Sequence, residues 1–125
     1  MTWINSLIAP YKDDAQTAII ALFEGIARRA NEPSCHGCTF LVAASEFPDV
    51  DHAAHQIARQ YKQAMLDLLH RLTQQAGAAD PQMLAEQLFL LMDGVWAAAR
   101  VFGPHNPSQS VVSAVRVLLT SATQG

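Results

Sequence analysis

The tetrapeptide Cys35-His36-Gly37-Cys38 carries the residue types best suited to chemistry in this sequence. Paired thiols support redox reactions, and thiolates together with histidines bind zinc. A zinc site would need further ligands, but the chain has no second C-x-x-C pair, and its remaining histidines are His52, His55, His70 and His105. Two interpretations stay open: the cysteines act as thiols, or Cys38 is a buried apolar residue at the start of a helix.

The neighbours of Cys38 argue against two known kinds of cysteine site. A c-type haem requires a histidine directly after the second cysteine, where this chain has Thr39. The tetrapeptide resembles that of the helical thiol peroxidases of the alkylhydroperoxidase family, but Val42 stands where that family has a histidine one helical turn later.

The carboxylates also offer no catalytic pair. Asp49 and Asp51 lie beside a proline and are predicted to be helix caps and not a paired acid and base. We therefore predict no catalytic residue, no metal ligand and no cofactor.

The composition is that of a compact globular protein. The chain has 125 residues, of which half are hydrophobic, so a single domain with a real core is expected. Its 8 Lys and Arg against 11 Asp and Glu give a formal charge of −3, which predicts binding neither to nucleic acid nor to a membrane surface. Because no Lys or Arg precedes Lys12 and no long apolar run follows, we expect no secretory signal and a cytoplasmic protein with reduced thiols.

One stretch, Pro81 to Phe102, is predicted to form the central helix against which the other segments of the chain pack. Its only charges are Glu86, Asp93 and Arg100, which are spaced seven residues apart and so form one narrow line on a helix. Opposite that line lies a leucine-rich seam. It is flanked by a bulky seam and by a small seam, namely Phe89, Met92 and Trp96, and Leu90, Gly94, Ala97 and Val101. A helix with three apolar seams must be covered on nearly all sides, so this one is predicted to be central.

The rest of the chain predicts further helices and no strand. Apolar residues at helical spacing favour helices over residues 14–31, 39–47, 51–75 and 107–123. The short helix over 39–47 is expected to be buried, and Asp49 or Asp51 is expected to start the long one. Residues 1–10 form a helical stub that Pro10 ends. We thus predict an all-α fold, an antiparallel helical bundle of about five main helices with an N-terminal stub.

Aromatic and methionine side chains on these helices suggest a ligand pocket. Such residues form adaptable apolar pockets, although the same stripes also occur in an ordinary core. The pocket is predicted between the helices over residues 14–31, 51–75 and 81–102, and its predicted ligand is a small apolar or aromatic molecule. The candidate ligand-binding residues are Phe23, Phe40, Tyr61, Met65 and Met92.

The apolar seams also predict a homodimer. The chain's own helices are not expected to cover both flanking seams of the 81–102 helix, and the last helix adds a second apolar face. Two such helices from each chain would form a four-helix interface around a two-fold axis. The sequence leaves open which flanking seam meets the partner. The candidate interface residues are Phe89, Leu90, Gly94, Trp96, Ala97, Val101, Val112 and Leu119.

A series of short motifs resembles a known family. They follow the order found in the C-terminal domain of TetR-family transcriptional regulators, over about residues 13–103 and more loosely in the last helix. A departure is Ala53, because a proline often follows the histidine in that family. The motifs are Gly37-Cys38, Glu46-Phe47-Pro48-Asp49, Asp51-His52, Ala76-Gly77, Asp80-Pro81 and Asp93-Gly94.

The resemblance implies a ligand-sensing and dimerisation domain. Family members begin with a helix-turn-helix domain, joined by a fourth helix to the ligand-binding part. The resemblance places residues 1–10 at the end of that linker helix, residues 13–103 in the family-like core and residues 107–123 in a C-terminal dimer helix. We therefore expect no DNA binding by this chain alone. Two alternatives remain: a small helical thiol enzyme using Cys35 and Cys38, and a structural dimerisation domain with no ligand.

Overall fold

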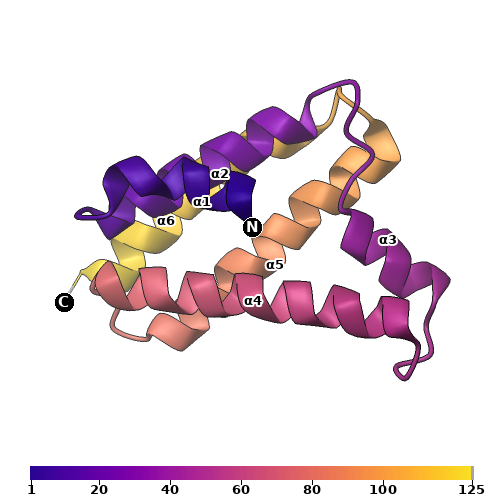
Figure 1. The fold of residues 1–125 in the computed structure, drawn as a ribbon. Helices are drawn as coiled ribbons and strands as arrows, with labels where there is room; N and C mark the ends of the chain where they lie inside the picture. The colour runs from indigo at the N-terminus through magenta and orange to yellow at the C-terminus, as the bar shows by residue number, and fades with distance from the viewer. Residues whose placement is uncertain (125) are drawn as a thin grey trace.

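The structure is entirely helical over the residues that it describes, 1–124, and it confirms the predicted all-α class (Figure 1). This computed structural model shows six α-helices and two short 3₁₀ turns, within the described residues. In chain order they are α1 (Thr2–Ile8), η1 (Ala9–Tyr11), α2 (Ala15–Ala30), α3 (Thr39–Glu46), α4 (Ala53–Gln75), α5 (Pro81–Phe102), η2 (Pro107–Gln109) and α6 (Ser110–Thr123).

Side-chain caps fix where α2, α4, α5 and η2 begin. Asp14 accepts a hydrogen bond from the backbone N–H of Thr17 at 3.1 Å, so α2 starts where the sequence predicts. Asp80 caps α5 in the same way, with Pro81 in the first turn where no N–H is needed. Asn106 caps the η2 turn that leads into α6.

The prediction that Asp49 or Asp51 caps the long helix is wrong. Asp49 Oδ1 instead accepts from the Asp51 N–H at 3.0 Å and closes a local turn. The cap of α4 is His52, whose Nδ1 accepts from the N–H of Ala54 at 3.1 Å. The imidazole nitrogen can replace a carboxylate oxygen as the cap acceptor, because it carries a lone pair and lies at a similar distance from the backbone.

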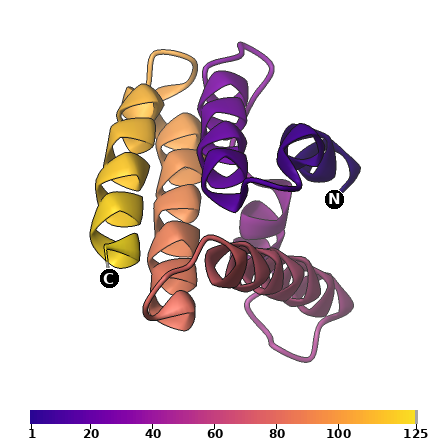
Figure 2. The ribbon, with the colours of Figure 1, turned by 90° about the vertical axis from the view of Figure 1, so that its left-hand side faces the viewer.

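Helices α2, α5 and α6 lie alongside one another, and α4 crosses their lower end (Figure 2). Helix α1 lies against α2, and the side chain of Leu7 fills the space over Gly25, where a Cβ would be 2.6 Å from it. The core is formed where α2 and α5 pack against each other and against α4 and α6. Its largest fully buried side chains include Phe23, Ile19, Leu22, Leu69 and Leu88.

The short helix α3 lies at the edge of the molecule, which corrects the expectation that it is buried. None of its described side chains is buried, and α4 is its only packing partner among the described helices. The apolar run is therefore one-sided. It covers the first half of α4 and leaves the rest of its surface to solvent.

A buried threonine joins α4 to α5. Thr73 is fully buried, and its Oγ1 lies 2.8 Å from the carbonyl oxygen of Pro81 and 3.0 Å from that of His70. Nearby, the N–H of Ala79 donates to the carbonyl of Ala122 at 2.9 Å, which fixes the end of α6 to the same turn. The α4–α5 turn is thus held by polar groups, not only by apolar packing.

Replacing Thr73 with valine should weaken this junction. The side chain keeps its shape, but the carbonyl of Pro81 loses its donor, so the free energy of unfolding should fall by about 1–2 kcal/mol. Urea unfolding followed by circular dichroism measures the change. Thr120→Val, at an exposed site on α6, is the control and should shift stability by less than about 0.5 kcal/mol. Equal effects of the two variants would contradict the assigned role of Thr73.

Candidate functional site

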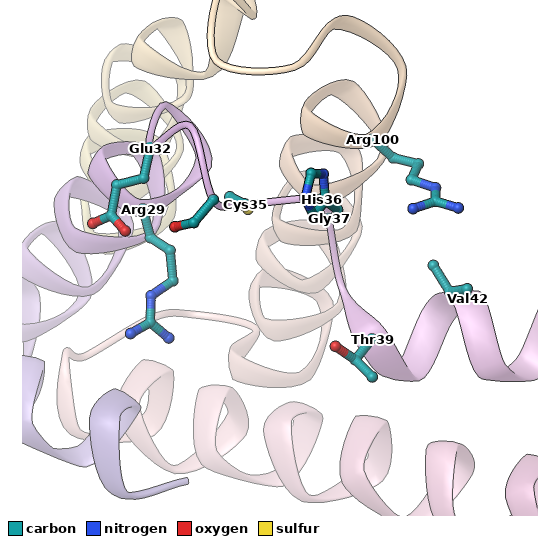
Figure 3. Close-up of a pocket in the computed structure, with 9 residues that line it drawn as sticks. Arg29, Glu32, Cys35, His36, Gly37, Thr39, Val42 and Arg100 are labelled. Carbon is teal, nitrogen blue, oxygen red and sulfur yellow. The ribbon is translucent and has the colours of Figure 1, made fainter.

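The loop between α2 and α3 borders a cavity of about 460 Å³ that it shares with the end of α5 (Figure 3). The loop contributes the first three residues of the C-x-x-C tetrapeptide. The lining residues are Arg29, Glu32, Ser34, Cys35, His36, Gly37, Thr39, Val42 and Arg100.

Gly37 brings this loop into direct contact with α5. Its φ of +92° lies in a region that side-chain-bearing residues rarely adopt. A Cβ at this position would also lie 2.8 Å from the backbone oxygen of Trp96 and 3.1 Å from the Cβ of Arg100. Only glycine satisfies both constraints, so the loop and α5 form one continuous wall.

Two arginines and one carboxylate, that of Glu32, carry the formal charges of the cavity wall. Figure 3 shows Arg29 and Arg100 on opposite sides of the loop. The guanidinium carbon of Arg29 lies 3.6 Å from the centroid of the Trp3 ring, a cation–π contact that also pins α1. Within residues 1–124, neither arginine forms an ion pair with a carboxylate. Both guanidinium groups are therefore available to an anionic group in the cavity.

A second polar group joins α4 to α5 and does not line the cavity. Lys62 Nζ lies 2.6 Å from Asp93 Oδ1, and both side chains are largely shielded from solvent. Burial by itself would lower the pKa of Lys62. The hydrogen bond and charge of Asp93, together with the adjacent Cys38 sulfur, outweigh burial and raise this pKa.

Tyr61 and Phe40 stack on each other next to this lysine. Their ring centroids are 4.2 Å apart and the planes differ by 14°. Burial raises the pKa of Tyr61, and the neighbouring Cys38 adds to the effect, so the phenol stays protonated at neutral pH. Of the predicted ligand-binding residues, these two alone are partly exposed, and neither lines the cavity.

The other predicted ligand-binding residues lie in the core. Phe23, Met65 and Met92 are each 2% exposed or less and pack with the apolar cluster. The prediction of a pocket among them stays untested, while the cavity described above has other walls. Sequence reasoning missed Arg29 and Arg100 as site residues. The available signal was their placement at the C-terminal ends of two helices that flank the C-x-x-C loop.

The two flanking seams of α5 have different surroundings. In the bulky seam, Met92 is buried, and Phe89 and Trp96 are half-buried against the chain's own core. In the small seam, Leu90 is 67% and Val101 is 74% exposed, and Gly94 has open space where a Cβ would point.

The two predicted interface residues of α6 also face the chain itself. Leu119 is 3% exposed and therefore belongs to the chain's own core, and Val112 is half-buried against it. The exposed face of α6 is formed instead by Ser110, Ser113 and Val117.

An apolar groove of about 320 Å³ runs between the small seam of α5 and α6. It shares no lining residue with the Cys35 cavity, and none of its walls comes from α2, α3 or α4. Its walls are Leu90, Leu91, Gly94, Val95, Ala98, Pro107, Ser108, Ser110, Val111 and Ala114. Of the small seam, Leu90 and Gly94 line this groove.

Neither a metal cluster nor a membrane-spanning helix is found in the described part of the chain. Residues 1–124 contain no group of three or more His, Cys, Asp and Glu side chains placed to hold a metal ion. None of the helices over the same residues combines the length and hydrophobicity that crossing a membrane requires.

Comparison with known proteins gives relatives in both sequence and structure. No protein-family model matches the sequence. The HTH-type transcriptional regulator YjdC of Escherichia coli strain K12 is 29% identical over 92 residues, which cover 74% of this chain and 48% of that protein. The protein of the same name from Shigella flexneri matches to the same extent. The chain thus spans about half the length of the curated relatives it matches.

Two solved structures share the fold. A TetR-family transcriptional regulator from Streptomyces coelicolor aligns with a TM-score of 0.91 at 26% identity, over 98% of this chain and 60% of that one. A tetr-transcriptional regulator from Streptomyces avermitilis aligns with a TM-score of 0.85 at 29% identity, over 97% of this chain and 67% of that one.

The chain has the fold of TetR-family regulators. The resemblance predicted from the sequence motifs is confirmed by these structures and by the curated relatives. All of these relatives are transcriptional regulators and not enzymes, in agreement with the prediction that this TetR-like chain is not an enzyme.

Proposed function

We propose that this chain is the ligand-sensing and dimerisation domain of a TetR-like transcriptional regulator. The observation that carries the proposal is the TetR-like fold over nearly the whole chain. Residues 13–103 would form the ligand-binding core and residues 107–123 the C-terminal dimer helix. With a formal charge of −3, the chain offers no basic surface for DNA, so DNA binding would depend on other parts of the regulator.

The cavity at the α2–α3 loop is the proposed effector site. Its volume of about 460 Å³ suits a small organic molecule. An apolar or aromatic effector remains the proposal, and the unpaired Arg29 and Arg100 favour one that also carries an acidic group. Such a ligand would place its acid at one arginine and its body against the loop and Val42.

A thermal-shift screen of aromatic carboxylic acids, each paired with its neutral amide, tests this proposal. The acids should raise the unfolding midpoint more than the amides do. Arg29→Gln and Arg100→Gln should weaken binding of the best acid by about tenfold, the worth of one charge-assisted hydrogen bond. Arg28→Gln is the matched control, because Arg28 is exposed on the same turn but does not line the cavity. If acids and amides bind alike and the variants change nothing, the effector site lies elsewhere. If no compound binds, a structural dimerisation domain without a ligand becomes the better explanation.

The small seam of α5 is the proposed centre of the dimer interface. Gly94 lies inside a long helix, where a glycine lowers stability by about 1 kcal/mol relative to alanine. Its own chain leaves open space where a side chain would point, so packing within the chain does not explain the glycine. Close approach of a second helix would explain it, because there is no side chain to hold the two backbones apart. Leu90 and Val101, together with the exposed Val117 of α6, then provide the apolar contacts. A second copy of the chain, related by a two-fold axis, would cover all three.

A further inference from the structure

Cys38 lies in surroundings in which cysteines react. It is half-buried, forms no disulfide, and is the N-cap residue of α3 without making a side-chain cap hydrogen bond. Cys38 is close enough to Lys62 for its charge and hydrogen bonding to contribute to the raised pKa of that lysine. Reactive cysteines in proteins occur where a thiol is partly accessible and adjacent to a cation. Cys38 meets both conditions.

Asp93 keeps the lysine in place. Lys62 is tied to Asp93 Oδ1 at 2.6 Å, and its side chain is only 19% exposed, so the ammonium cannot swing freely into solvent. The carboxylate also ensures that the lysine is charged at neutral pH. The cation is therefore a fixed feature of the α4–α5 contact.

A second thiol lies three residues before Cys38 on the loop that lines the cavity. Cys35 is also free and half-buried, and its backbone N–H donates to the Glu32 carbonyl at 3.0 Å. Between the two cysteines, the positive φ of Gly37 turns the chain, and its contact with Trp96 holds the turn against α5. The C-x-x-C spacing is the one that redox-active cysteine pairs use.

We propose that Cys35 and Cys38 form an oxidant-responsive pair, in which Cys38 reacts first with a hydroperoxide and Cys35 resolves the product to a disulfide. The thiolate of Cys38 attacks one peroxide oxygen. An S–O bond forms, the O–O bond breaks, and the leaving alkoxide or hydroxide takes a proton and departs as alcohol or water. The sulfur is oxidised to sulfenic acid and the peroxide is reduced.

The Cys35 thiol then attacks the sulfenic sulfur of Cys38. An S–S bond forms, the S–O bond breaks, and the hydroxide leaves as water with the proton of Cys35. Each chain reacts once until a thiol reductant restores the pair, so the reaction is a modification and not catalytic turnover. Because Cys35 lines the cavity and Cys38 begins α3, the disulfide joins the cavity wall to α3.

Mass spectrometry of the intact protein after titration with hydrogen peroxide tests the pair. The wild-type chain should lose the mass of two hydrogen atoms and regain it with dithiothreitol. Cys35→Ser should stop at sulfenic acid on Cys38, which a dimedone probe traps. Cys38→Ser should stay reduced under the same conditions. If Cys38→Ser reacts as the wild type does, or if the wild-type thiols react no faster than free cysteine, the proposal is overturned.

The lysine is tested separately by the rate of oxidation. Lys62→Gln should slow sulfenic acid formation in the Cys35→Ser background by about tenfold. Lys12→Gln, at an exposed lysine between η1 and α2, is the matched control and should leave the rate unchanged. Asp93→Asn, which keeps the lysine but frees it, checks the result if Lys62→Gln unfolds. An unchanged rate in folded Lys62→Gln and Asp93→Asn would remove Lys62 from the proposal. Because these readouts are masses and rates, they do not depend on the proposed effector.

Discussion

Replacing Ala97 with glutamate should convert the proposed dimer into a monomer that remains folded. Ala97 is exposed in the middle of the small seam, between Gly94 and Val101. In a two-fold dimer the substitution would place two carboxylates in one apolar interface, where each loses its hydration without gaining a cation. We expect the dissociation constant to rise by at least about 100-fold, measured by sedimentation equilibrium.

Two further variants show whether the effect belongs to the interface. Ala64→Glu makes the same change at an exposed alanine of α4 and should leave the dimer intact. Trp96→Glu affects the bulky seam, which packs on the chain's own core, and should lower the unfolding midpoint. A wild-type chain that sediments as a monomer at tens of micromolar, roughly the range of a weak dimer, would refute the dimer itself.

Replacing Asn106 with alanine should cause the largest loss of stability from a single polar side chain in this fold. Its Nδ2 donates to the carbonyl of Ala30 at 2.7 Å and to that of Gly103 at 2.6 Å, while its Oδ1 accepts from Ser108. The residue thus joins the end of α2 to the α5–α6 connection. The alanine variant loses a cap and leaves a buried carbonyl without a donor, so the free energy of unfolding should fall by about 2–4 kcal/mol.

Chemical denaturation of the variant, with circular dichroism as the probe, measures this loss. The control is Asn5→Ala, because Asn5 is exposed on α1 and its side chain holds no comparable junction. That variant should change stability by less than about 0.5 kcal/mol. A loss below about 1 kcal/mol for Asn106→Ala would mean that water replaces its bonds and that the junction is held by packing alone.

Local signals in the sequence predicted the helices well. Helix α5 begins at Asp80-Pro81 and ends at Gly103, as predicted. These signals are reliable because a cap, a first-turn proline and a positive-φ glycine act on their immediate neighbours. The start of α4 was missed for a related reason. Three candidate caps lie within four residues, and the choice of His52 depends on the turn that Asp49 makes with Asp51.

Features that depend on packing between distant segments were harder to predict. The seams of α5 follow from helical periodicity, but the surroundings of each seam depend on where α3 and α4 lie. The sequence therefore left the choice of seam open, and the packing of the half-buried Trp96 against the chain's own core, compared with the exposure of Leu90, now favours the small one. The pocket predicted among aromatic side chains stays a prediction, whereas the cavity at the α2–α3 loop was not predicted, because a loop held by Gly37 against α5 has no signature in hydrophobic patterning.

The stacking of Arg29 on Trp3 gives the protein an optical reporter of its own. The chain has only two tryptophans, and both touch the cavity wall: Trp3 lies under Arg29, and the backbone of Trp96 lies against Gly37. Indole emission depends on nearby charge and on solvent. A ligand that binds the Arg29 guanidinium and moves it off the Trp3 ring should expose that ring to solvent and change the tryptophan fluorescence. Occupancy of the cavity can thus be read from the unlabelled chain by its ultraviolet fluorescence.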